Sequence, residues 1–245
     1  PFSYVWSNGQ TAAAATGLCA TTYFVTVTDA NGCVSVASVT ISEPAGIWGF
    51  TTTTNVKCNG GSDGTANVTA NGGVLPFTYK WSNGATTQQL INLIAGTYYA
   101  TVTDNNGATY IDTAVVMQPT LLTVTTGKTD VNCNSGVNGS ATSTPAGGTS
   151  PYTYKWTNAA TTQNISGIPA GTYTVTTTDA NGCKSNASTT ITQPTALVLK
   201  TGKVDATCGN ADGNAGVTAS GGTPAYSYKW NTGTTTQSIS TVLAG

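Results

Sequence analysis

A six-residue motif recurs at a fixed interval and constrains the fold more than any other feature. Residues 76–81 read Pro-Phe-Thr-Tyr-Lys-Trp, and close variants occupy 1–6, 151–156 and 225–230. The tryptophans that close these motifs, spaced 75, 75 and 74 positions apart, are Trp6, Trp81, Trp156 and Trp230. A fixed period of this length indicates one structural unit copied in tandem.

Proline-containing dipeptides mark the expected boundaries of the units. Glu43-Pro44, Gln118-Pro119 and Gln193-Pro194 recur at intervals of 75 residues. Proline lacks a backbone donor and stiffens the chain, so neighbouring units should be held at restricted angles. The expected division is the C-terminal part of a repeat at 1–44, complete repeats at 45–119 and 120–194, and the N-terminal part of a repeat at 195–245. We therefore expect a piece of a longer array.

Within a unit, apolar and polar residues alternate with the period of a β-strand. Phe77, Tyr79 and Trp81 share one face, whereas Thr78 and Lys80 lie on the other. Asn-Gly and Gly-Gly turn signals separate six or seven such segments in each unit, and no segment has a helical period. The pattern predicts an all-β fold of antiparallel β-sandwiches, each about 75 residues long, in a linear array.

The aromatic residues that recur in phase with the repeat are expected in the core. They face inward in the predicted strands, and the tyrosine of each Gly-Thr-Tyr segment is placed to form a corner hydrogen bond, as in immunoglobulin-like domains. This expected core signature comprises Trp6, Trp81, Trp156, Trp230, Tyr23, Tyr98 and Tyr173. Trp48, Tyr99 and Tyr110 break the pattern, which makes them candidates for exposure or for contacts between units.

The composition excludes several classes of function. Charged residues make up 7% of the chain, there is no His or Arg, and the net charge is -1. Nucleic-acid binding requires a clustered basic surface, which this chain cannot build. No apolar run approaches the roughly 20 residues of a membrane span, so we expect no membrane insertion in this segment.

The residues that ordinary enzyme sites need are also missing from the sequence. Without His, neither a nucleophile–His–acid triad nor a histidine-activated thiol can form. Asp29, Asp104 and Asp179 lie in Thr-Asp-x-Asn-Gly segments. We interpret these segments as Asx-stabilised turns, because a calcium loop needs several alternating oxygen ligands. We expect no enzymatic activity, no metal and no cofactor.

Four segments together resemble the SprB repeat. They are Cys-Asn-Gly-Gly-Ser-Asp-Gly at 58–64, Gly-Gly-x-x-Pro-Phe-x-Tyr-x-Trp-Ser-Asn-Gly-Ala-Thr-Thr at 72–87, Ala-Gly-Thr-Tyr at 95–98 and Val-Thr-Asp-Ala-Asn-Gly-Cys at 27–33. This repeat occurs in giant surface adhesins of gliding Bacteroidetes and in related secreted proteins. The resemblance covers essentially the whole chain. It implies an immunoglobulin-like extracellular repeat, often exported by the type IX route.

The cysteines occupy two repeat positions, with one exception. Cys58, Cys133 and Cys208 open their units, and Cys33 and Cys183 follow the Asn-Gly turn near the end of theirs, where the middle unit has Ala108. We expect a Cys133–Cys183 disulfide within one unit, because a small domain gains stability from a disulfide of its own. Cys33 and Cys208 would then have partners outside this chain, and Cys58 would be free. The alternative joins neighbouring units through Cys33–Cys58 and Cys183–Cys208.

Cys19 lies outside both repeat positions. It matches a variant of the family with an extra cysteine, whose partner should lie upstream. A zinc site is not expected, because the cysteines are isolated and there is no histidine.

These observations favour a structural protein over a catalytic one. The leading hypothesis is an extracellular repeat array that forms an adhesin stalk or cell-surface filament, linked to gliding or surface attachment. Its partners would be further copies of the repeat in the same chain and other chains of a filament. The alternative is an array of polysaccharide-binding modules. Asp112-Thr113-Ala114 also resembles the O-glycosylation signal of Bacteroidetes, which predicts a sugar on Thr113.

Overall fold

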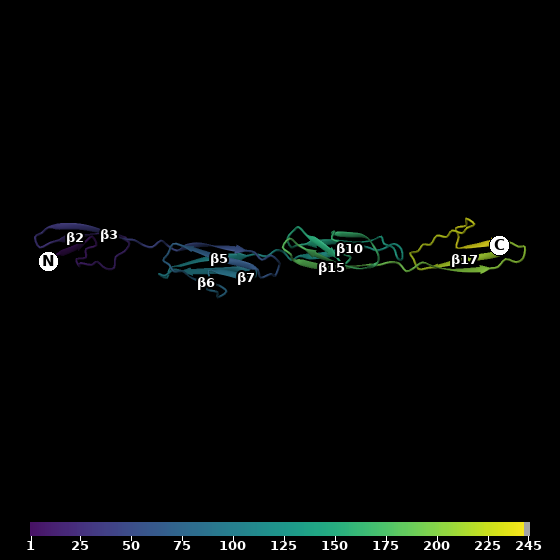
Figure 1. Cartoon of the computed structure of the whole chain (residues 1–245), viewed down its shortest axis with the longest axis horizontal. Coiled ribbons are helices and arrows are strands. Elements are labelled where there is room, and N and C mark those ends of the chain that lie inside the picture. The colour runs from purple at the N-terminus through teal and green to yellow at the C-terminus, as the bar shows by residue number, and fades with distance from the viewer. Residues whose placement is uncertain (243–245) are drawn as a thin grey trace. The chain divides into compact units, whose positions relative to one another are not determined.

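The computed structural model describes residues 1–242, and these residues form only strands and loops (Figure 1). Within residues 1–242, eighteen strands assemble into six three-stranded antiparallel sheets, which confirms the all-β prediction. No helix that could cross a membrane occurs in the described part of the chain. The chain divides into two compact units, one holding residues 1–55 and 62–116 and the other holding 56–61 and the residues from 117 onward.

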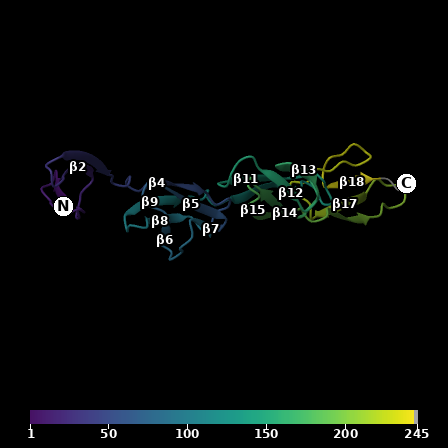
Figure 2. The same ribbon diagram turned by 60° about the vertical axis from the view of Figure 1, so that its left-hand side comes forward.

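The first compact unit contains three sheets, with the strand orders β1-β2-β3, β4-β5-β7 and β6-β8-β9 (Figure 2). Their bounds are β1 (Ser3–Trp6), β2 (Thr21–Thr28), β3 (Val34–Ile41), β4 (Trp48–Thr54), β5 (Gly64–Asn71), β6 (Thr78–Trp81), β7 (Gln89–Leu93), β8 (Gly96–Thr103) and β9 (Thr109–Val116). The last two sheets face each other through β4 and β5 on one side and β9 on the other.

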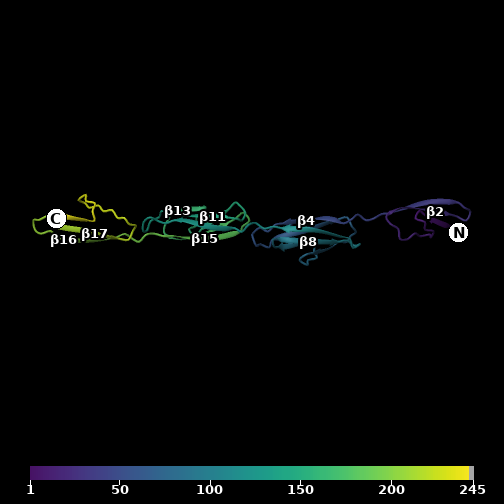
Figure 3. The same ribbon diagram turned by 180° about the vertical axis from the view of Figure 1, so that it is seen from behind.

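The second compact unit repeats this plan, with the strand orders β10-β11-β13, β12-β14-β15 and β16-β17-β18 (Figure 3). Their bounds are β10 (Thr123–Thr129), β11 (Gly139–Ala146), β12 (Thr153–Trp156), β13 (Asn164–Ile168), β14 (Gly171–Thr178), β15 (Lys184–Ile191), β16 (Val198–Val204), β17 (Gly213–Ser220) and β18 (Ser238–Val242). The sheets β10-β11-β13 and β12-β14-β15 pack together through β10, β11, β14 and β15.

The core of the second sandwich shows why the alternating segments form strands. Tyr173, Val175 and Thr177 alternate along β14 and are buried, whereas their neighbours are less buried. Trp156 is 1% exposed, and its indole N–H donates to Thr162 O at 2.9 Å, so burial leaves no unpaired donor. Each buried large apolar side chain stabilises the fold by about 1.5–3 kcal/mol.

The predicted tyrosine corner is present in both sandwiches. Tyr98 Oη donates to Ile94 O at 3.0 Å, and Tyr173 Oη donates to Pro169 O at 3.1 Å. In each case the tyrosine is bonded to the backbone four residues upstream, as in immunoglobulin-like domains. Strands β4 to β9 form one immunoglobulin-like β-sandwich of six strands, and strands β10 to β15 form another.

The two outer segments of the chain each contain one of the two sheet types. Residues 1–44 form β1-β2-β3, whose pairing of Trp6 with Val25 matches that of Trp156 with Val175. Residues 195–242 form β16-β17-β18, which has the strand order of β10-β11-β13 and the same register shift beside Gly213 as that beside Gly139. The repeat boundaries expected from the sequence stay a prediction.

Candidate functional site: a disulfide-bonded junction

The loop 56–61 is hydrogen-bonded to the last three residues of the 45–119 repeat, at the predicted boundary with the next repeat. Val56 N donates to Met117 O at 3.0 Å, and Gly60 N donates to the Gln118 side-chain carbonyl at 2.7 Å. Asn59 Nδ2 donates to Pro119 O at 3.0 Å. Hydrogen bonds therefore hold the predicted Gln-Pro boundary in place.

The turn that carries Cys183 is organised by one carboxylate. Asp179 Oδ1 accepts hydrogen bonds from Asn181 N and Cys183 N at 2.9 Å, and Oδ2 accepts one from Thr149 N at 2.9 Å. Burial of Asp179 raises its pKa, but the backbone donors, led by Thr149, outweigh burial and leave the pKa below its ordinary value. The predicted Asx turn is confirmed, and the carboxylate stays ionised.

A disulfide joins the loop to the turn. Cys58 and Cys183 are 125 residues apart in sequence, and their Cα atoms lie 5.7 Å apart. Beside the disulfide, Asn181 Nδ2 donates to Lys57 O at 2.9 Å. The opening cysteine of one repeat is thus bonded to the closing cysteine of the next.

This connectivity overturns the predicted Cys133–Cys183 pair, the alternative pairs and the expectation that Cys58 is free. The loop of Cys133 is hydrogen-bonded to Thr192, after the end of β15, whereas Cys183 lies just before its start. Eight strand residues span about 26 Å, well beyond the roughly 7 Å between Cα atoms that a disulfide allows. A single repeat therefore cannot close its own disulfide.

The remaining cysteines of the described residues are exposed and free, namely Cys19, Cys33, Cys133 and Cys208. The backbone of Cys19 forms a hydrogen bond, in which Cys19 N donates to Tyr23 Oη at 3.1 Å. The described part of the chain has no cluster of His, Cys, Asp or Glu able to hold a metal ion.

The burial of the recurring tryptophans depends on whether both sheets of the sandwich are present. Trp81 and Trp156 are buried between the two sheets of complete sandwiches, whereas Trp6 and Trp230 are half-buried on single sheets. Tyr23 and Tyr173 are buried, and Tyr98 is half-buried.

The aromatic residues outside the repeat pattern have different surroundings. Trp48 and Tyr99 are 57% and 53% exposed, whereas Tyr110 is half-buried and donates from Oη to Gly49 O at 2.6 Å. Phe50, which the sequence reading did not single out, is 49% exposed two residues after Trp48 on β4. Thr113 is exposed on β9, and its backbone N–H is bonded to the Asp112 carboxylate.

The family comparison matches the part of each repeat from the first strand to the tryptophan strand. The SprB repeat family matches residues 50–86, 125–161 and 201–235. The chain carries SprB repeats. The start of each match falls one repeat after the last, and the first two matches each include the cysteine loop, the Gly-Gly turn and the buried tryptophan of a complete sandwich.

The solved structures that resemble the chain include tandem Ig domains and a fragment of intimin. The N-terminal four Ig domains of Dscam1 isoform 9.44 share 12% identity at a TM-score of 0.31, covering 78% of this chain and 64% of that one. A C-terminal fragment of intimin, in complex with the intimin-binding domain of its receptor, shares 17% identity at a TM-score of 0.32, covering 73% and 60%. The chain spans less than two thirds of the length of these structures. No curated protein matches it.

Sequence reasoning missed the junction because its first choice paired cysteines within one repeat, and its alternative joined the closing cysteine of one repeat to the opening cysteine of the next. One signal was available. Ala108 replaces the closing cysteine of the 45–119 repeat, yet Cys58 is retained at its opening position. A disulfide that crosses from one repeat to the next explains this combination directly.

Proposed function

We propose that this chain is part of a non-catalytic extracellular repeat array that forms an adhesin stalk or cell-surface filament, used in surface attachment or gliding. In this proposal, 45–119 and 120–194 are each one complete repeat and neighbouring repeats are the main partners. The observation that carries the proposal is the Cys58–Cys183 disulfide. The SprB repeats, the low charge and a disulfide suited to an oxidising compartment support secretion to the cell surface.

The disulfide gives the array a mechanical property that a load-bearing stalk needs. Tension that enters before Cys58 and leaves after Cys183 passes through the sulfur–sulfur bond. The 124 residues between them (183 − 58 − 1) are shielded from that tension. Unfolding them would otherwise release about 400 Å of extended chain. A covalent bypass of this kind keeps the length of a stalk nearly constant under load.

Single-molecule force spectroscopy tests the proposal. The oxidised chain, pulled from its ends, should lack the extension of residues 59–182, and Cys58→Ser should restore it. Cys133→Ser is the matched control and should extend like the unmodified chain. Equal contour lengths for the oxidised chain and Cys58→Ser would contradict a load-bearing role for this bond.

A second candidate function is polysaccharide binding. Trp48 and Phe50 are exposed on the same face of β4, about 7 Å apart along the strand, which suits stacking against sugar rings. A glycan array probed with the chain should show signal that Trp48→Ala removes and Tyr99→Ala retains, because Tyr99 lies on the other sheet. Absence of binding, or equal loss in both variants, would reject this candidate.

A further inference from the structure

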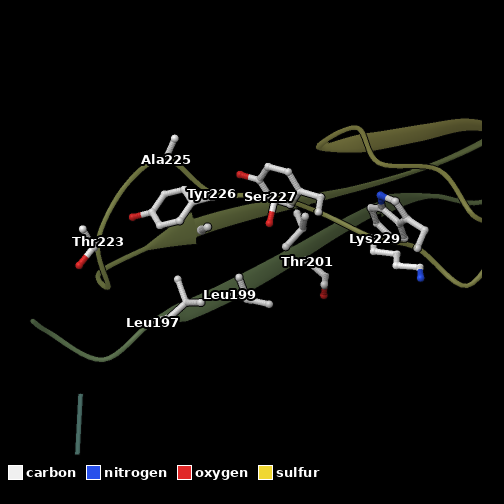
Figure 4. Close-up of a pocket in the computed structure, with 12 residues that line it drawn as sticks. Leu197, Leu199, Thr201, Thr223, Ala225, Tyr226, Ser227 and Lys229 are labelled. Carbon is white, nitrogen blue, oxygen red and sulfur yellow. The ribbon is translucent and has the colours of Figure 1, made fainter. Parts of the chain in front are cut away.

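The apolar surfaces of the chain are of two kinds, and one of them is core. A cavity of about 590 Å³ lies on the inward face of β16-β17-β18, where Leu197 and Leu199 lie along one strand and the Tyr226 ring faces them (Figure 4). The equivalents of the two leucines in the 120–194 repeat are Leu122, which is buried, and Val124, which packs against the core. The cavity is therefore the core side of a sheet and carries no ligand site.

The outer faces of the 45–119 sandwich are the second kind of apolar surface. Both sheets of this sandwich are present, so its outer faces are not exposed core. Large apolar side chains are exposed on them at positions where the 120–194 sandwich has polar residues. Trp48, Phe50, Tyr99 and Ile111 correspond in the repeat to Thr123, Thr125, Thr174 and Asn186. The 120–194 sandwich folds without these apolar side chains, so their role lies outside folding.

Trp48 and Phe50 form a row on the outer face of β4. Asn71 of β5 lies opposite Trp48, and Thr69 lies opposite Phe50. Gln89 of β7 follows on the same face, one strand further on. We call these five residues the outer platform.

Trp48 differs from the other four tryptophans of the chain in its hydrogen bonding. Those four each donate from the indole N–H to a backbone carbonyl at 2.8–2.9 Å, and they are Trp6, Trp81, Trp156 and Trp230. The indole N–H of Trp48 has no partner within residues 1–242. Trp48 therefore offers both an exposed ring and an unused donor.

The polar members of the outer platform also have unused groups. The side-chain amides of Asn71 and Gln89 form no hydrogen bond in the described part of the chain. Each amide can both donate and accept. Together with the Trp48 indole N–H, they place donors and acceptors beside an aromatic surface.

The sheet that carries the outer platform is uncharged. Strands β4, β5 and β7 contain no Lys, Arg, Asp or Glu. An ionic ligand would lose hydration on this face without gaining a counter-charge. The platform therefore favours a neutral ligand that has both apolar faces and hydroxyl groups.

We propose that the outer platform binds a neutral polysaccharide as an extended chain that lies along β4. The C–H faces of the sugar rings stack on Trp48 and Phe50, and the sugar hydroxyl groups pair with the Trp48 indole N–H and with the amides of Asn71 and Gln89. Two aromatic rings in one row, about 7 Å apart along the strand, favour a chain of sugar rings over a single monosaccharide.

This inference rests on the second candidate function, polysaccharide binding, and goes further in two ways. It names the class of polysaccharide as neutral. It also confines the site, within residues 1–242, to the 45–119 repeat, because β10 has Thr123 and Thr125 in place of the two aromatic residues.

Surface plasmon resonance with immobilised polysaccharides tests the proposal. The neutral probes are a β-glucan, a galactomannan, an arabinoxylan and a dextran, and the anionic probes are alginate and polygalacturonate. The chain should bind at least one neutral probe and neither anionic probe. Its affinity for the neutral probe should not change with salt concentration, because no ion pair is formed.

The neighbouring repeat supplies variants that should fold normally. Trp48→Thr combined with Phe50→Thr installs the residues of β10 and should lower the affinity at least about tenfold. Asn71→Ala installs the equivalent residue of β11 and should lower the affinity about threefold, because one amide is lost. The matched control is Tyr99→Thr, which installs the equivalent residue of β14 on the other sheet and should leave the affinity unchanged.

Nuclear magnetic resonance locates the site directly. The five indole N–H signals of the chain can be followed while an oligosaccharide from the bound neutral probe is added. The Trp48 signal, assigned by its loss in Trp48→Thr, should move. The other four signals should stay in place, because their N–H groups already donate to backbone carbonyls.

The outcomes separate this inference from the functions on which it rests. Tighter binding to an anionic probe, or neutral binding that survives the double variant, would overturn the inference and leave polysaccharide binding standing. Absence of binding to every probe would remove both. The stalk role is tested separately by force spectroscopy and does not depend on any of these results.

Discussion

At the scale of single residues, the two complete repeats differ at buried positions that change their stability. Ser143 and Thr177 lie in the core of the second sandwich, and neither hydroxyl has a hydrogen-bond partner within residues 1–242. The first sandwich has Val68 and Val102 at these positions. A buried hydroxyl without a partner costs free energy that an apolar group of the same shape does not.

Thr177→Val should therefore stabilise the protein. Valine has nearly the shape of threonine and removes the unpaired hydroxyl, so the free energy of unfolding should rise by about 1 kcal/mol. Denaturation followed by tryptophan fluorescence measures the change. Thr174→Val is the control, because the Thr174 hydroxyl is hydrogen-bonded to Ser188 and its loss should bring no gain. Destabilisation by Thr177→Val would show that the hydroxyl has a role in the core.

Acid should destabilise the fold through its turn and edge carboxylates. The pKa of Asp130 is lowered to about 2 by the Thr192 N–H and by Lys128, and the pKa of Asp104 is lowered chiefly by the Val74 N–H. A pKa that is lower in the folded state contributes stability above the ordinary value of 3.8, and that stability is lost as the pH falls through the folded value.

We expect the melting temperature to hold above pH 4 and to fall between pH 3.8 and about 2. Melting curves across this range measure the effect. Asp130→Asn should reduce the decrease in melting temperature at low pH, because the amide has no charge to lose. An unchanged pH profile in this variant would show that Asp130 is not among the groups responsible.

At the scale of elements, a hydrogen bond links each Gly-Gly turn to the Asx turn of the same sandwich. Gly147 has φ +71°, and a Cβ there would collide with the backbone carbonyl of Leu121. Gly148 N donates to Thr120 O at 2.9 Å, and the next residue, Thr149, donates to Asp179. The turn thus needs both a left-handed backbone and the close approach of the segment that precedes β10.

Gly147→Ala should destabilise the second sandwich more than Gly182→Ala. Gly182 also has positive φ, at +86°, but a Cβ there would enter open space. Gly182→Ala should cost about 1–2 kcal/mol from backbone strain alone, and Gly147→Ala should add the cost of moving the Leu121 carbonyl. Melting temperatures of the two variants measure the difference. Equal decreases in melting temperature would show that the close approach of Leu121 to Gly147 contributes nothing to stability.

At the scale of the whole molecule, the disulfide couples one repeat to the next. A loop of 125 residues closed by a disulfide stabilises the folded state by about 5 kcal/mol in the chain-entropy model. Reduction should therefore lower the melting temperature of the unmodified chain and leave Cys58→Ser unaffected. Cys133→Ser should respond to reduction as the unmodified chain does. A reduction-sensitive Cys58→Ser variant would show that another disulfide exists in solution.

The sequence by itself determined the strands, the turns and the inward-facing tryptophans, because these depend on local alternation and on residues that favour turns. Each local pattern recurs at a fixed period. The recurrence, together with the resemblance to the SprB repeat, was therefore enough to predict the sandwich and the tyrosine corner. Only the tertiary structure decided which cysteines pair. Cys133 and Cys183 lie at opposite ends of β15, whereas the loop of Cys58 meets the turn of Cys183 where two repeats join. That meeting depends on packing between repeats, which no single repeat encodes.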